Sequence, residues 1–180
     1  MREQDLTQYC LWAEERGATD TKQIHPSSVV TAPWVPLKCQ FGCPYYGKNY
    51  CCPPDTPTPE RMRAVLDSYR RAILFHIEAP KRPDRGKRFR DFFDMLVTLE
   101  GELFKDGFYS ALLLVAGPCR ICNVCGKAEG RPCSFMERAR PSMESCGIDV
   151  YQTVRNNGST IKPLRERDET QNQFCLMLVD

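Results

Sequence analysis

The chain has 180 residues, of which 42% are hydrophobic and 27% charged, and its net charge is +2. This composition argues against a disordered chain, and so small a net charge gives no reason to expect binding to nucleic acid or to an anionic membrane. No apolar run approaches the ~20 residues of a membrane span, residues 1–5 contain no apolar signal-peptide core, and we expect one domain over residues 1–180.

The first third of the chain is predicted to hold a short helix followed by irregular segments. Apolar residues recur at helical spacing over residues 5–16, and Gly17 is expected to end that helix. Residues 20–38 are polar and contain prolines, with a short strand expected at 29–31. Residues 39–57 contain prolines and glycines at close intervals, which predicts a loop.

The middle of the chain reads as strand, helix and strand. A second helix is expected from Thr58-Pro59, since proline suits the first helical turn. Residues 72–77 form an apolar run typical of a buried strand. A long helix is expected over 84–106, because its phenylalanines and leucines form one apolar stripe and Gly107 follows it. Residues 109–115 are predicted to form a second apolar strand.

The last part of the chain adds short helices and a final strand. Ser134 and Glu137 have the spacing of a capping box, which predicts a short helix directly after Cys133. A further helical turn or two is expected over 149–156, a polar excursion over 159–172, and a last apolar strand over 174–179. The order of elements predicts an α/β fold: a small sheet of three to four strands packed with helices, with cysteine-rich cluster-binding loops at one end.

Eleven cysteines are present, and four follow a C-x2-C-x2-C-x7-C pattern at Cys119, Cys122, Cys125 and Cys133. Three thiolates at spacing two can turn toward one point, which is how short loops hold three corners of an iron–sulfur cube, with a more distant cysteine on the fourth. Zinc sites more often pair two separate C-x2-C knuckles, so we favour a [4Fe–4S] cluster over zinc. Cys133 is the expected fourth ligand, with Cys146 as its rival.

A second set of cysteines lies upstream, at Cys39, Cys43 and the adjacent pair Cys51 and Cys52. Three thiols on a loop that cannot form long regular structure suit a second cluster, so we expect one or two clusters per chain. Adjacent cysteines point apart in an extended segment, and the pattern alone leaves open which of the pair joins Cys39 and Cys43.

Several of these motifs together resemble a known family. They are Lys38-Cys39-x3-Cys43-Pro44-x-Tyr46-Gly47-Lys48, Cys52-Pro53-Pro54, Gly117-Pro118-Cys119-x2-Cys122-x2-Cys125, Glu129-Gly130-x-Pro132-Cys133 and Ala139-Arg140-Pro141-Ser142-Met143-Glu144-x2-Gly147-Ile148-Asp149-Val150. From about Val29 to Val154, the chain resembles the family called domain of unknown function 2284, whose members are described as predicted metal-binding proteins. The resemblance implies that Cys52 is the ligand of the adjacent pair, because the cysteine before Pro-Pro belongs to the family pattern. It implies no reaction.

The function expected from the sequence is an iron–sulfur protein that carries electrons to a partner redox enzyme. No phosphate loop, dinucleotide fingerprint or hydrolase triad is present. One alternative is an enzyme, or an enzyme-activating component, in which the cluster on Cys39, Cys43 and Cys52 offers an open iron. Another is a zinc-stabilised interaction module. So many clustered thiols without an export signal suggest the reducing cytoplasm. Five cations around the cysteines of residues 119–133 suit an acidic partner: Arg120, Lys127, Arg131, Arg138 and Arg140.

Overall fold

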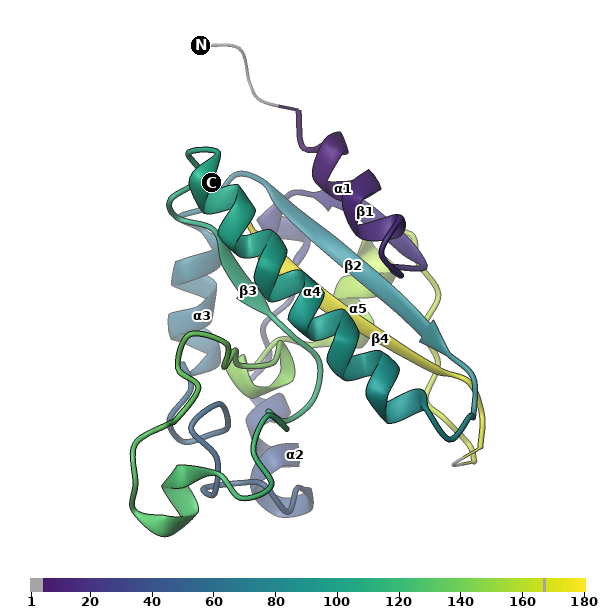
Figure 1. Ribbon diagram of the computed structural model, residues 1–180. Helices are drawn as coiled ribbons and strands as arrows, with labels where there is room; N and C mark the ends of the chain where they lie inside the picture. The colour runs from purple at the N-terminus through teal and green to yellow at the C-terminus, as the bar shows by residue number, and fades with distance from the viewer. Residues whose placement is uncertain (1–4, 167) are drawn as a thin grey trace.

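Four strands form one sheet in the computed structural model, which describes residues 5–166 and 168–180. The spatial order is β1-β2-β4-β3, and each neighbouring pair is antiparallel. The strands are β1 (Asp20–Ile24), β2 (Ala72–Ala79), β3 (Leu112–Leu114) and β4 (Gln171–Leu178). The small sheet of an α/β fold, expected from the sequence, is confirmed (Figure 1).

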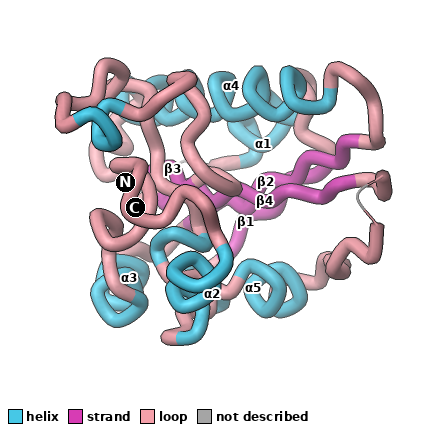
Figure 2. The backbone as a smooth tube through the Cα atoms, turned by 90° about the horizontal axis from the view of Figure 1, so that it is seen from below, coloured by secondary structure: helices cyan, strands magenta, loops and turns pink. Residues whose placement is uncertain are grey.

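Helices cover both faces of the sheet (Figure 2). The helices α1 (Thr7–Glu14) and α4 (Arg85–Lys105) lie on one face. On the other face lie α2 (Trp34–Gly42), α3 (Pro59–Leu66) and α5 (Val150–Asn156). Short 3-10 turns occur at Pro26–Ser28, Gly126–Glu129 and Glu144–Cys146. The arrangement is a three-layer sandwich in which β4 is inserted between β2 and β3.

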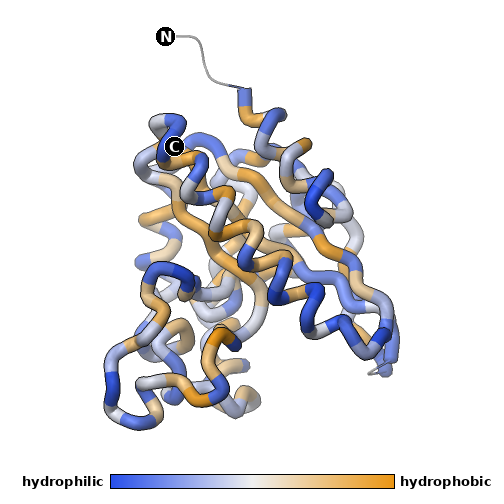
Figure 3. The backbone as a smooth tube through the Cα atoms, in the orientation of Figure 1, coloured by the Kyte–Doolittle hydropathy of each residue, from blue (hydrophilic) through white to orange (hydrophobic). Residues whose placement is uncertain are grey.

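The two central strands are apolar on both faces, which explains why each face needs a covering layer (Figure 3). Ile73 and Phe75 belong to the hydrophobic cluster under α1 and α4, and Leu74 to the cluster on the opposite face. All three side chains are at most 2% exposed. Burying each one contributes roughly 1.5–3 kcal/mol relative to leaving it in water.

Most of the helices expected from periodicity and capping are present. The Thr58 hydroxyl accepts a hydrogen bond from the Arg61 N–H at 3.3 Å and begins α3. The Asp149 carboxylate does the same for the Gln152 N–H at 3.0 Å and begins α5. The long α4 buries Phe89, Phe92 and further apolar residues on one side, as its stripe predicted.

The third strand is shorter than expected. Pairing with β4 covers only Leu112–Leu114, because the preceding residues turn through a hydrogen bond from the Ala111 N–H to the Phe108 carbonyl. At Val115 the chain leaves β4 and bridges Ser142 instead. The strand expected at 29–31 is reduced to a single bridge between Thr31 and Ile148.

Three other expectations were wrong. The capping box at Ser134 opens no helix. Hydrogen bonds from the Arg138 and Ala139 N–H groups to the Phe135 carbonyl close only one turn. Pro141 then disfavours helical geometry in the residue before it.

Residues 20–38 contain a regular strand, β1, and the start of α2, and Cys39 lies on that helix rather than in a loop. Pro36 is the third residue of α2, within the first turn, where its missing N–H costs no helical hydrogen bond.

Among the described residues of the polar excursion over 159–172, none belongs to a helix or strand before β4 begins at Gln171. Residue 167 lies outside the described residues.

Candidate metal centre

Two cysteine-bearing segments, residues 43–58 and 117–141, lie side by side near α2 in the lower part of Figure 1. The Asn49 side-chain N–H donates to the Cys119 carbonyl at 3.0 Å, and the Tyr50 hydroxyl donates to the Arg131 carbonyl at 2.9 Å. Lys127 also forms an ion pair with Asp55 across the segments. These contacts hold the two loops together although 70 or more residues separate them in the sequence.

A cavity of about 250 Å³ lies between these segments, and five cysteines line it: Cys51, Cys119, Cys122, Cys125 and Cys133. The four cysteines of the C-x2-C-x2-C-x7-C pattern are thus brought to one space, together with one cysteine from the upstream set. The loop that carries them is tightly folded: a Cβ placed on Gly126 would stand 2.5 Å from the Pro132 carbonyl oxygen. Gly126 therefore allows the chain to pass directly against the segment that leads into Cys133.

Cys51 and Cys119 are in direct contact. The Cys51 thiol donates a hydrogen bond to the Cys119 sulfur, which lowers the pKa of Cys119 and raises that of Cys51. The Ile121 N–H also donates to the Cys119 sulfur and lowers its pKa further. A backbone donor and a neighbouring thiol therefore both face the Cys119 sulfur.

Desolvation raises the pKa of the Cys122 thiol, the negative charges of Cys119, Cys125 and Cys133 raise it further, and Arg131 acts in the opposite direction. Like charges that disfavour one another in this way are stabilised when they share a bound cation or cluster.

Cys39, Cys43 and Cys52 form a second group. Cys39 lies in the last turns of α2 and Cys43 follows four residues later at the helix end, so the two can share one face. Burial raises the pKa of Cys52 to about 11, with added contributions from the charges of Cys43 and Cys39. Burial and the charges of Cys43 and Glu144 raise the pKa of Cys39 as well.

The adjacent pair Cys51 and Cys52 is thereby divided between the two groups. Sequence reasoning did not assign Cys51 to the 119–133 loop. The one available signal was that adjacent side chains in an extended segment point apart.

No three of the described histidine, cysteine, aspartate or glutamate side chains stand close enough together to hold a single metal ion. Four thiolates around one tetrahedral zinc ion have sulfurs only ~3.8 Å apart, given Zn–S bonds of ~2.3 Å. The thiols of the 119–133 loop surround a space rather than converge on one point.

The comparison with known families bears on this centre. The sequence model of a family described as "Predicted metal-binding protein (DUF2284)" matches residues 22–179. The chain belongs to the DUF2284 family. No curated protein and no solved structure matches it. The DUF2284 description supports metal binding and leaves the metal unspecified.

The remaining cysteines of this DUF2284 protein lie elsewhere. Cys146 is 1% exposed within the hydrophobic cluster on the α3 and α5 face, and burial raises its pKa to about 11. It is not among the residues that line the cavities beside the two cysteine groups. Cys10 and Cys175 are buried in the cluster under α1 and α4, where they pack as small apolar side chains.

The cations around the 119–133 loop of the DUF2284 protein are mostly paired. Lys127, Arg131, Arg138 and Arg140 form ion pairs with Asp55, Glu129, Asp94 and Glu100, respectively. The Arg120 guanidinium lies 6.0 Å from the centre of the Tyr45 ring. Little of the positive charge expected to attract an acidic partner is therefore left uncompensated.

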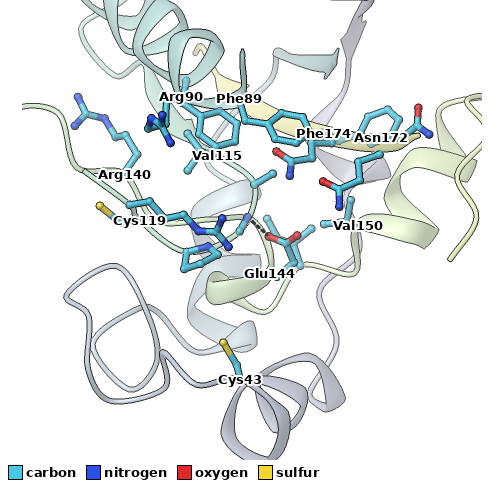
Figure 4. A pocket seen from close by; sticks show the side chains of 18 of the residues that line it. Cys43, Phe89, Arg90, Val115, Cys119, Arg140, Glu144, Val150, Asn172 and Phe174 are labelled. Atoms are coloured by element: carbon cyan, nitrogen blue, oxygen red, sulfur yellow. Dashed lines mark hydrogen bonds between the residues drawn. The ribbon is translucent and has the colours of Figure 1, made fainter. Parts of the chain in front are cut away.

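A much larger cavity, of about 1010 Å³, lies beside the second cysteine group, and Cys39, Cys43 and Cys119 are among its lining residues (Figure 4). Glu144 projects into it, and its carboxylate accepts a 3.4 Å hydrogen bond from the Gly117 N–H. Desolvation raises the pKa of Glu144 despite its hydrogen bonds, which include one from Ser142.

In the DUF2284 protein, no helix among the described residues is long and apolar enough to cross a membrane.

Proposed function

We propose that this DUF2284 protein binds a [4Fe–4S] cluster on Cys119, Cys122, Cys125 and Cys133 and carries electrons to a partner redox enzyme. The observation that supports it is the single cavity lined by all four thiols. The donor set fits the group, because it is composed of thiols and includes a backbone N–H directed at a sulfur. A bound cluster supplies one-electron transfer at a potential that the surrounding hydrogen bonds adjust.

The chain's own residues account for the rest of the proposal. The backbone from Cys119 to Gly126 curls around the cavity, and the neighbouring loop holds this segment through Asn49 at Cys119 and through Tyr50 at Arg131. Cys51 is a fifth thiol at the same cavity and competes with Cys133 for the fourth position. All eleven cysteines are free thiols, which suits a reducing compartment such as the cytoplasm.

The test is anaerobic purification followed by analysis of iron, sulfide and zinc. About four irons per chain with equal sulfide, and brown colour, are expected for one cubane cluster. Cys122→Ser should lose that iron, whereas Cys10→Ser, a buried cysteine outside both groups, should keep it. A colourless protein with zinc alone would refute the proposal and favour a zinc-stabilised interaction module.

A second candidate is an enzyme, or a component that activates one, with a second cluster on Cys39, Cys43 and Cys52. It is favoured by the large cavity, because that cavity reaches the Cys39 and Cys43 thiols and leaves room for a substrate beside them. About eight irons per chain would support two clusters. About four, with these three thiols free to react with an alkylating agent in the folded protein, would remove the second one.

A further inference from the structure

The large cavity lies where β3 leaves the sheet. β3 pairs with β4 only opposite Leu176–Leu178. The chain then turns away at Val115, so residues 171–174 of β4 line the cavity instead of pairing with a neighbouring strand on that side. The first turns of α4 close one side, and residues 148–151 and 161–164 close the other. Its volume of about 1010 Å³ lies at the upper end of the ~300–1,000 Å³ typical of small-molecule sites.

The charge of the lining is strongly one-sided. Eight lysines or arginines line the cavity, against the three carboxylates Asp94, Glu144 and Asp149. Two of these cations are neutralised, Arg138 by Asp94 and Arg140 by Glu100. Four others have no carboxylate partner among the described residues: Lys38, Arg82, Arg90 and Lys162. Unpaired cations that converge on a concave surface raise the local concentration of anions.

The positions of these groups separate the two ends of the cavity. Figure 4 shows Arg90 on the α4 side, with Glu144 across from it and Cys43 beyond Glu144. An anionic group held near Arg90 therefore avoids the Glu144 carboxylate. The rest of the ligand is left to extend toward the cysteines.

The walls between the two ends are largely apolar. Phe89, Phe93, Ile161 and Phe174 provide the apolar surface. Such walls suit a ligand with an apolar body, because small-molecule sites combine apolar surface with a few charged or polar groups that fix orientation.

We propose that this cavity binds an organic anion with an apolar body, its carboxylate or phosphate group held by Arg82, Arg90 and Lys162 and its far end beside Cys39 and Cys43. The proposal goes beyond the function argued above, because anion binding does not depend on which metal the cysteines hold. If a second cluster is present on Cys39, Cys43 and Cys52, the ligand lies beside it.

Isothermal titration calorimetry of the full chain, purified anaerobically with its metal, tests this directly. The probes are 2-naphthoate, 2-naphthyl phosphate and the neutral 2-naphthamide. At least one of the two anions should bind about tenfold more tightly than the amide, and the tighter anion identifies the head group. The affinity should also fall as salt is added.

Variants locate the binding. Arg90→Gln and Lys162→Gln remove exposed cations of the lining and should each weaken the tighter anion by roughly fivefold to tenfold. The matched control is Arg61→Gln, which removes an exposed cation from α3, outside this cavity, and should leave the affinity unchanged.

Equal binding of the amide and both anions, no binding of any probe at millimolar concentration, or equal losses for Arg61→Gln and Arg90→Gln would each overturn the proposal. Iron and sulfide are measured in the same samples. A protein that binds the anion but contains no iron refutes the proposed cluster and leaves the anion site intact. A protein that contains the cluster but binds no probe refutes the anion site and leaves the proposed cluster intact.

Discussion

Replacing Arg140 with methionine should strongly destabilise the fold, because it strands a buried carboxylate. Glu100 lies on α4 with a side chain that is 10% exposed. One of its oxygens accepts the Leu113 N–H at 2.7 Å, and the other accepts the Arg140 Nε–H, also at 2.7 Å. The pair therefore connects the segment after the 119–133 loop to α4 and to the start of β3.

The magnitude follows from burial. Removing one partner of a buried ion pair costs ~3–5 kcal/mol, since the remaining charge has lost its compensation. Arg140 is 20% exposed, so water can partly replace it and the lower end, ~3 kcal/mol, is appropriate. For a chain of this length that loss lowers the unfolding midpoint by ~6–12 °C. Thermal and urea unfolding, followed by circular dichroism on the same metal-loaded form, measure both quantities.

Arg138 provides the matched control. It lies two residues away and pairs with Asp94 on the same helix, but its side chain is 43% exposed and that of Asp94 48%. Arg138→Met should shift the midpoint by no more than ~4 °C, because exposed ion pairs contribute at most ~1 kcal/mol. Glu100→Gln added to Arg140→Met should recover part of the loss, since the glutamine oxygen still accepts the Leu113 N–H and carries no charge. Equal losses for the two arginine variants, or no recovery in the double variant, would refute the reasoning from burial.

Two further predictions concern a glycine and the fourth cluster ligand. Gly147→Ala should lower the free energy of unfolding in urea by more than Gly158→Ala does. Both glycines have positive φ, which alone costs an alanine ~1–2 kcal/mol. Only at Gly147 would the new Cβ also stand 2.6 Å from the Pro59 Cγ. Equal costs would show that Pro59 moves aside freely. Cys133→Ser should change the iron content and the electron paramagnetic resonance spectrum of the first cluster, and Cys146→Ser should not. The opposite result would make Cys146 the ligand.

Where local sequence carries the signal, the sequence predicted the fold well. The apolar stripe of α4 and the caps of α3 and α5 act within a few residues, so they are visible in the sequence without any knowledge of the tertiary structure. The strand β1 was missed because Asp20–Ile24 is mostly polar and lies at the edge of the sheet, where only one neighbour is required. The helix expected after Cys133 does not form: only one hydrogen-bonded turn closes after Ser134, and Pro141 disfavours helical geometry in the residue before it.

The sequence by itself predicted two groups of cysteines and the membership of a family described as predicted metal-binding proteins, because ligand spacing within a loop is a local property. The family resemblance already placed Cys52 with Cys39 and Cys43, and the tertiary structure added that Cys51 lies against Cys119. Which of the two thiols faces which group depends on how two loops about 70 residues apart in the sequence pack together. The large cavity is likewise a tertiary feature, since it arises where β3 leaves β4, at a point that no local pattern marks.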